Sequence, residues 1–301
     1  MLRISGVVAI AYVAFCVGAS SAADSSPVAP GATLQKLSGG FEFTEGPASD
    51  SQGNIYFTDQ PNDRIMIWSA DGKLSTFMQP CGRSNGLCFD PQRNLIACAD
   101  EHNELWSIDV KTRQHTVLVK DYKGKLLNAP NDIWVRPDGG MYFTDPWYKR
   151  DYWNRGPTEQ DAEGVYYLSP DHKTLTRVIS DYKRPNGIIG TPDGKTLYIA
   201  DIDGHKTWSY TSNADGSLSN KKHFCDLGSD GMTIDSEGNV YLTGNGVTIF
   251  DRTGKQIAHI DVKEPWTANI CFGGTDRHLL FITASKNIYG LRMRTAGVGS
   301  Q

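Results

Sequence analysis

Short runs of apolar and β-branched residues alternate along this chain with turns rich in Asp, Gly, Asn and Pro. In one example, the turn at residues 50–53 leads into the run at 54–59, which ends in Thr-Asp, and a second run follows at 65–68 before the turn at 71–72. Runs of this length, rich in Tyr, Phe, Ile, Val and Thr, predict β-strands. No long helical period is present, which disfavours a parallel α/β fold.

The pattern of turn, strand, turn and strand recurs six times. The copies begin at Asp50, Asp90, Arg136, Thr191, Asp235 and Thr275. Their spacing of about 45 residues is typical of a β-propeller blade. A single blade cannot cover both of its faces, whereas six blades arranged radially bury them against one another. We therefore predict an all-β, six-bladed propeller with four-stranded antiparallel blades around a central channel.

The last blade of a closed ring needs a strand from one end of the chain. Either an N-terminal strand near residues 36–43 or a C-terminal strand near Leu291 is expected to complete it. Closure of this kind removes exposed sheet edges.

The N-terminus has the features of an export signal. An uncharged stretch from Ile4 to Ala19 follows Arg3, and small residues at 20–23 offer a cleavage site. An uncleaved anchor is the alternative, but the stretch is short for a transmembrane span of about 20 residues. We expect a periplasmic or secreted protein without stable membrane insertion, divided into a signal peptide (1–23), a flexible leader (24–35), the propeller (36–294) and a C-terminal tail (295–301).

The composition is that of a globular protein, with 39% hydrophobic and 21% charged residues. Lys and Arg total 30 against 34 Asp and Glu, for a formal net charge of -4, so no basic excess exists to neutralise nucleic acid. We expect a small-molecule ligand and a monomer or weak dimer. An odd number of cysteines follows the cleavage site, which predicts buried thiols with at most one or two disulfides among Cys81, Cys88, Cys98, Cys225 and Cys271.

The third copy is interrupted by an insertion at residues 146–163 that contains Trp147, Tyr148, Tyr152 and Trp153. Long loops on a rigid scaffold are often functional. We expect these aromatic residues to form a wall or lid over the channel mouth that selects substrate. A flap packed on the adjacent blade is the alternative.

Polar residues recur just before the first strand of successive copies, and we call their places the axial positions. They are Glu45, Asn85, Asn131, Asn186 and Asp230. In a propeller the segment entering the innermost strand lines the channel, so these side chains should converge. Each Asn-Gly or Asp-Gly pair alone is an ordinary turn signal, but a turn does not require the glutamate or the repetition.

Two carboxylates and several amide carbonyls make an all-oxygen ligand set. Such a set suits a hard divalent cation, and we expect one Ca²⁺ ion, with Zn²⁺, Mn²⁺ and Mg²⁺ left open. The sequence contains no H-E-x-x-H motif. The axial positions are therefore the candidate site.

These segments resemble the SMP-30/gluconolactonase/luciferin-regenerating-like family, which is related to diisopropylfluorophosphatase-type hydrolases. The resemblance extends over residues 41–291 and rests on Glu-Gly-Pro, Pro-Asn-Asp, Pro-Asn-Gly and Ser-Asp-Gly-Met in that order. It implies a metal-dependent hydrolase of lactones or organophosphates. It also implies that Glu45, Asn131, Asn186 and Asp230 hold the metal, with Asn131 also contacting the metal-bound water and substrate.

One departure bears on the substrate. Sugar-lactone-hydrolysing members have an arginine two residues before the asparagine that matches Asn131, whereas this chain has Ala129 there. Other residues would then shape the pocket, and the candidates are Asn85, Arg83, Trp147 and His205.

The expected function is that of a gluconolactonase-like lactonase or esterase. A metal at the axial positions would polarise the carbonyl and activate water, with Asp230 as general base and Asn131 as its catalytic neighbour. Direct attack by Asp230 is the alternative chemistry. An organophosphate or aryl-ester hydrolase and a binding module with a structural Ca²⁺ are the alternative functions.

Overall fold

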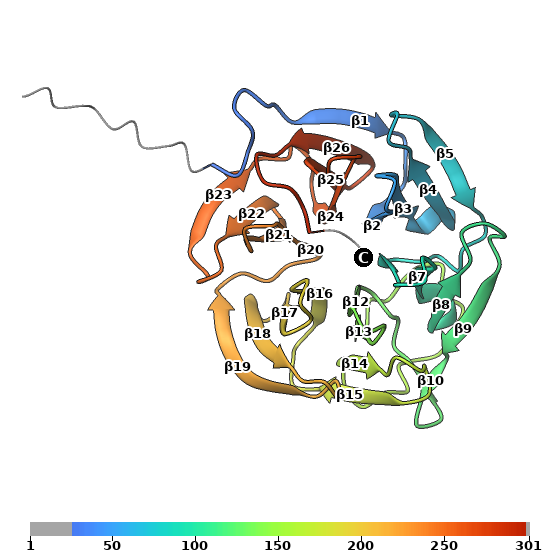
Figure 1. Ribbon diagram of the computed structural model, residues 1–301. Helices are drawn as coiled ribbons and strands as arrows, with labels where there is room; N and C mark the ends of the chain where they lie inside the picture. The colour runs from blue at the N-terminus through green and yellow to red at the C-terminus, as the bar shows by residue number, and fades with distance from the viewer. Residues whose placement is uncertain (1–25, 299–301) are drawn as a thin grey trace, which may run out of the picture.

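The computed structural model describes residues 26–298, and the expected signal peptide lies outside these residues. Six four-stranded antiparallel sheets stand around a central channel (Figure 1), which confirms the predicted six-bladed propeller. Only two short 3-10 helices interrupt the strands of this region, η1 (Gln60–Asn62) and η2 (Asp100–His102). Within residues 26–298, no helix is long and apolar enough to cross a membrane.

Each of the first five blades is a meander of consecutive strands. Blade 1 contains β2 (Thr44–Ser49), β3 (Ile55–Asp59), β4 (Arg64–Trp68) and β5 (Leu74–Met78). Blade 2 contains β6 (Leu87–Phe89), β7 (Leu95–Ala99), β8 (Glu104–Ile108) and β9 (His115–Val119). Blade 3 contains β12 (Ile133–Val135), β13 (Met141–Asp145), β14 (Gly164–Leu168) and β15 (Leu175–Ile179). Blade 4 contains β16 (Pro185–Gly190), β17 (Thr196–Asp201), β18 (Lys206–Ser212) and β19 (Leu218–Cys225). Blade 5 contains β20 (Met232–Ile234), β21 (Val240–Gly244), β22 (Gly246–Phe250) and β23 (Gln256–Ile260).

The sixth blade closes the ring with a strand from the other end of the chain. Its inner strands are β24 (Thr267–Gly273), β25 (Leu279–Ala284) and β26 (Asn287–Arg292), and its outermost strand is β1 (Gln35–Gly39). β1 pairs antiparallel with β26, with Gln35 opposite Gly290. Of the two closures considered from the sequence, the structure therefore has the N-terminal one.

Ordered contacts extend beyond both ends of the predicted 36–294 propeller. On the N-terminal side, Val28 forms an isolated bridge with Met293. On the C-terminal side, Asp235 bridges Gly297, and the Thr295 hydroxyl donates to Asp235 Oδ2 at 2.8 Å. These contacts attach residues on either side of the predicted boundaries to blades 5 and 6.

The hydrophobic core is divided among the interfaces between neighbouring blades. In β3, Phe57 packs towards blade 6, with its ring 5.5 Å from that of Phe281, whereas Tyr56 packs towards blade 2, 5.4 Å from Phe89. Successive strand residues point to opposite faces of a sheet, so one short apolar strand serves two interfaces. This explains why the strands are nearly continuous apolar runs.

The insertion at residues 146–163 connects β13 to β14 without a strand of its own. A hairpin of β10 (Asp121–Tyr122) and β11 (Lys125–Leu126) lies beside it. The Gln160 amide donates to the carbonyls of Lys125 and Leu126 at 2.9 and 3.0 Å, and the Glu159 carboxylate accepts the Leu126 N–H at 2.8 Å. The end of the insertion is therefore fixed to the segment that leads from blade 2 to blade 3.

All five cysteines of the described region are free thiols, and all but the half-buried Cys88 are buried. The expectation of buried thiols agrees with this arrangement, and residues 26–298 contain no disulfide.

Candidate functional site

The five axial positions lie at one end of the channel. Glu45 belongs to β2 and Asn186 to β16, while the other three residues immediately precede the innermost strands β6, β12 and β20. Every one of these side chains is at most 9% exposed. The sequence prediction that these residues enter the innermost strands is therefore correct.

Aspartates at the end of the second strand fix the backbone ahead of the axial positions. The Asp59 carboxylate accepts the backbone N–H groups of Glu42 and Phe43, just before Glu45. Asp145 does the same for Asn128 and Ala129, and Asp201 for Lys183 and Arg184. The recurring Thr-Asp or Ala-Asp of the sequence pattern thus fixes the segment that enters the same blade at the channel.

Among the four blades whose second strand leads into an aspartate, blade 2 is the exception to this arrangement. There the backbone N–H groups of Cys81 and Arg83 donate to Asp63, at 2.9 and 2.7 Å. The corresponding strand-end residue, Asp100, instead accepts hydrogen bonds from the side chains of Gln60 and Trp153, at 2.9 and 2.6 Å. Asp100 therefore holds the insertion.

Glycines after the axial positions allow the blades to approach one another. A Cβ atom on Gly86 would lie 2.5 Å from the Asn131 carbonyl oxygen, and one on Gly231 would lie 2.0 Å from the Asn269 side chain. Both distances are shorter than any allowed contact, so the Asn-Gly and Asp-Gly pairs serve close packing around the channel.

Direct hydrogen bonds link three parts of the site. The Asn186 Nδ2 group donates to Asp230 Oδ1 at 2.8 Å and to the Tyr148 hydroxyl at 2.9 Å. The Trp266 indole N–H donates to Asp230 Oδ2 at 2.6 Å. Both carboxylate oxygens of Asp230 are thus oriented by neutral donors, and Tyr148 attaches the insertion to the site.

A cavity of about 600 Å³ opens above these residues. Of the residues predicted from the sequence, Glu45, Asn131, Asp230 and His205 line it. Asn85 is 1% exposed, and neither atom of its amide group has a hydrogen-bond partner. The structure therefore brings three of the four predicted metal-site residues to one opening, and the fourth, Asn186, is hydrogen-bonded to Asp230.

Three predicted substrate-binding residues do not line this cavity, and they are Asn85, Arg83 and Trp147. The Arg83 guanidinium lies 4.3 Å from the centre of the Tyr152 ring and forms a 3.4 Å ion pair with Glu101. The Trp147 ring packs 5.0 Å from that of Trp153. Arg83 and Trp147 therefore pack within the insertion or against it. A direct role of either residue in binding substrate stays a prediction.

The cavity also contains residues that the sequence analysis did not single out as a site. Arg150 and Trp266 line it, and Tyr148 had been counted only among the aromatic residues of the insertion. Trp266 lies just ahead of the sixth inner strand. It is aromatic, whereas the axial positions of the other copies hold Glu, Asn or Asp, so the repeat does not reveal it. Arg150 lies in the insertion, which has no counterpart in the other copies.

Burial dominates the electrostatics of the two acidic side chains. It raises the pKa of Glu45 well above its usual value, and the nearby Asp230 carboxylate raises it further. Burial likewise raises the pKa of Asp230, while the hydrogen bonds from Trp266 and Asn186 and the charge of Arg150 act in the opposite direction. Within residues 26–298, neither carboxylate has a salt-bridge partner within 4.0 Å.

This arrangement fits a divalent cation. Buried, unpaired carboxylates are costly without a compensating charge. The Asn186 Oδ1 atom is buried without a hydrogen-bond partner, although its Nδ2 group is fully used. The described residues hold no group of three or more His, Cys, Asp or Glu side chains suited to a metal, so amide oxygens would have to complete the ligand set.

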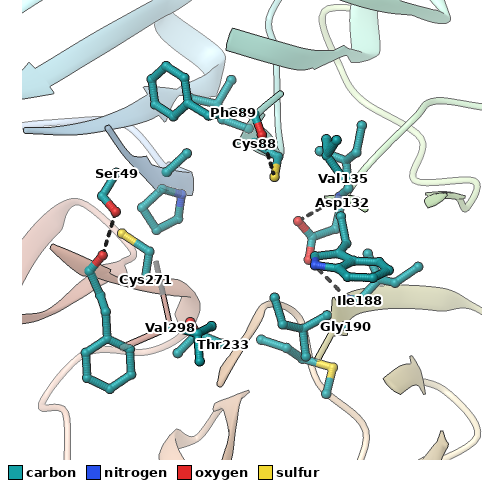
Figure 2. A pocket seen from close by; sticks show the side chains of 18 of the residues that line it. Ser49, Cys88, Phe89, Asp132, Val135, Ile188, Gly190, Thr233, Cys271 and Val298 are labelled. Carbon is teal, nitrogen blue, oxygen red and sulfur yellow. Dashed lines mark hydrogen bonds between the residues drawn. The ribbon is translucent and has the colours of Figure 1, made fainter. Parts of the chain in front are cut away.

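A second, smaller cavity of about 150 Å³ lies further along the channel and is lined by residues of all six inner strands. Figure 2 shows the Asp132 carboxylate and the Cys88 thiol pointing into it. Asp132 accepts the backbone N–H groups of Ile133 and Ile188, at 3.0 and 3.3 Å. None of the residues that line this cavity lines the opening above Glu45 and Asp230, so the two are separate.

Residues 43–286 match the family model described as the SMP-30/Gluconolactonase/LRE-like region. A gluconolactonase from Zymomonas mobilis is 29% identical over 293 residues, which cover 88% of this chain and 82% of the relative.

Solved structures agree with this similarity. A gluconolactonase from Xanthomonas campestris superposes with a TM-score of 0.82 at 29% identity, covering 89% of this chain and 91% of that one. Regucalcin from Agrobacterium tumefaciens, described as a calcium-binding protein, has a TM-score of 0.75 at 20% identity, covering 89% and 96%. The regucalcin comparison supports the fold alone.

Proposed function

Because this chain belongs to the SMP-30/Gluconolactonase/LRE-like family, we propose that it is a metal-dependent lactonase of the gluconolactonase type. The observation that carries the proposal is a pair of buried carboxylates, Glu45 and Asp230, which line a cavity of about 600 Å³ and have no ion-pair partner within 4.0 Å among residues 26–298. The gluconolactonases among its relatives support a cyclic ester as substrate.

Glu45, Asn131, Asn186 and Asp230 are the residues that would hold the cation, and their all-oxygen set favours Ca²⁺. When bound, a divalent cation polarises the ester carbonyl and lowers the pKa of a water molecule. The Asn186 Oδ1 atom is free to face such an ion because its Nδ2 group is engaged with Asp230 and Tyr148.

Asp230 is the proposed general base. The Asn186 and Trp266 donors use one acceptor direction on each of its oxygens, and a carboxylate has about four in total. Asp230 can therefore accept a proton from the attacking water while its orientation stays fixed. Attack on the carbonyl by Asp230 itself is the alternative, and Asn131 would orient the substrate.

Removal of metal tests this proposal. Treatment with a chelator should abolish hydrolysis of glucono-δ-lactone, and added Ca²⁺ should restore it, while circular dichroism stays nearly unchanged. Activity that survives complete metal removal would refute the proposed mechanism. A wild-type protein that hydrolyses no lactone, but cleaves aryl esters or phosphotriesters, would refute the proposed substrate class.

We also propose that residues 1–23 direct export. Determination of the N-terminus of protein recovered from outside the cytoplasm should show cleavage near Ala23. Recovery of the intact N-terminus from the cytoplasm would contradict this proposal.

A further inference from the structure

Arg150 is the cation that the insertion places at the candidate site. Its side chain lines the same cavity as Glu45, Asn131 and Asp230. The guanidinium lies 5.1 Å from the centre of the Tyr148 ring, whose hydroxyl contacts Asn186. Arg150 is thus connected to the site through a single aromatic side chain.

A buried aspartate, Asp100, holds the side chain of Arg150 in position. Its Nε atom lies 3.4 Å from Asp100 Oδ2, and Asp100 is only 1% exposed. Asp100 also accepts hydrogen bonds from Gln60 and Trp153, at 2.9 and 2.6 Å. Since Asp63 takes over its backbone role in blade 2, the Asp100 carboxylate is available for this support.

The two terminal amino groups of Arg150 are left for another partner. Within residues 26–298, the hydrogen bond of this side chain is the one from Nε to Asp100. A guanidinium with two free Nη groups is suited to oxygen acceptors, which it can bind in a bidentate manner. The carboxylates of the site do not use these donors, because neither forms an ion pair with Arg150 within 4.0 Å.

Ala129 cannot provide such a contact. It is 2% exposed, has no polar side-chain atom, and its backbone N–H is used by Asp145. The segment that enters the inner strand of blade 3 therefore presents no positive charge to the site. The adjoining insertion presents one through Arg150.

Resting on the lactonase function proposed above, we propose that Arg150 is a specificity-determining residue that binds the hydroxyl or carboxylate substituents of the lactone. The reacting ester group would lie over Glu45, Asn131 and Asp230, with the oxygen-bearing side of the ring towards the Arg150 Nη groups. The enzyme would then favour polyhydroxylated or acidic lactones over unsubstituted ones.

The test compares two six-membered lactones, glucono-δ-lactone and δ-valerolactone, which differ in their hydroxyl substituents. Arg150→Met should lower kcat/KM for glucono-δ-lactone by about tenfold to a hundredfold, the cost expected for lost charged hydrogen bonds. The loss on δ-valerolactone should be at least about tenfold smaller, because that ring offers nothing for the guanidinium to bind. Arg150→Lys should recover part of the preference.

Two further measurements separate binding from a structural defect. Calorimetry should show weaker binding of gluconate to Arg150→Met, with no loss of Ca²⁺ affinity. The matched control is Lys149→Met, which removes one positive charge from an exposed neighbour in the same insertion. This control should leave both lactones and gluconate unaffected.

An equal loss on both lactones, or unchanged gluconate binding, would overturn the assignment of Arg150 while leaving the lactonase function intact. A wild-type protein that hydrolyses neither lactone would instead refute the proposed function, and the role of Arg150 with it. The wild-type measurement therefore distinguishes the two failures.

Discussion

The indole Nε1 of Trp266 donates a 2.6 Å hydrogen bond to Oδ2 of Asp230. Trp266 is 37% exposed, which is unusual for so large an apolar side chain, and it lies at the edge of the cavity. The same residue therefore orients an acidic side chain of the candidate site and presents an aromatic surface to whatever enters.

Trp266→Phe should weaken the site without removing a ligand. The substitution keeps an aromatic ring but deletes the donor to Asp230, and loss of such an outer partner typically costs about 10–100-fold in metal affinity or activity. Calorimetric titration with Ca²⁺ measures the change. Trp106→Phe is the matched control, because the Trp106 indole makes an equivalent 2.6 Å bond to Glu104 in blade 2. If the two variants bound Ca²⁺ equally well, the proposed role of Trp266 would be wrong.

Glu45→Gln and Asp230→Asn should each greatly reduce metal affinity. Each substitution removes one of only two anionic ligands and keeps the size of the side chain. Asp235→Asn is a suitable control, since Asp235 is another buried carboxylate, 1% exposed, whose partners are protein groups in blade 5 and the C-terminal segment. That control should change thermal stability and leave metal affinity alone. Unchanged affinity in both site variants would rule out the assigned ligands.

Asp100→Ala should loosen the insertion. The variant removes the acceptor for Gln60, Arg150 and Trp153. Hydrogen bonds to a charged group contribute about 1.5–3 kcal/mol each, so trypsin should cut after Lys149, Arg150 or Arg155 at least about tenfold faster. Asp100→Asn, which keeps one acceptor oxygen, should show a smaller increase. Cleavage at the wild-type rate in Asp100→Ala would show that the insertion is held by other contacts.

The contrast between Asp100 and its counterparts shows what the sequence can and cannot predict. The repeat, the blades and the axial residues follow from local patterns, because each copy must form the same strands and point the same position at the channel. Asp59, Asp100, Asp145 and Asp201 end equivalent strands in the sequence, yet only three of them hold their own loop. Asp100 differs because Asp63 accepts the backbone hydrogen bonds of the segment that enters blade 2. This exchange of roles depends on a tertiary contact between blades.

The contribution of Arg150 was hidden for a similar reason. An insertion has no equivalent in the other copies, so the repeat gives no indication of which of its side chains faces the channel. Only the anchoring contacts to Asp100 and the Tyr148–Asn186 hydrogen bond establish which residues face the cavity.

The thiols should react slowly in the native protein. Burial raises the pKa of Cys81 and of Cys88 to about 12 and that of Cys225 to about 11. At pH 8 these groups are protonated and the reactive thiolate is rare, so labelling by a disulfide reagent should be at least about 100-fold slower than in denaturant. The rate should rise with pH as the thiolate forms. Fast reaction of Cys81, Cys88 or Cys225 at pH 8 would contradict the raised pKa of these thiols.

Removal of the N-terminal strand should destabilise the whole propeller. Without β1, the backbone groups of β26 that pair with residues 35–39 become an open edge, which favours aggregation. The contacts of Val28, Ala32 and Leu34 with the core between blades 5 and 6 are lost as well. For a domain of this size a loss of 1 kcal/mol lowers Tm by about 2–4 °C, so deletion of residues 24–39 should lower Tm by well over 5 °C in a single transition. Deletion of residues 24 and 25 alone is the control and should leave Tm unchanged. A 24–39 deletion that melts like the full protein would show that closure of the ring does not depend on β1.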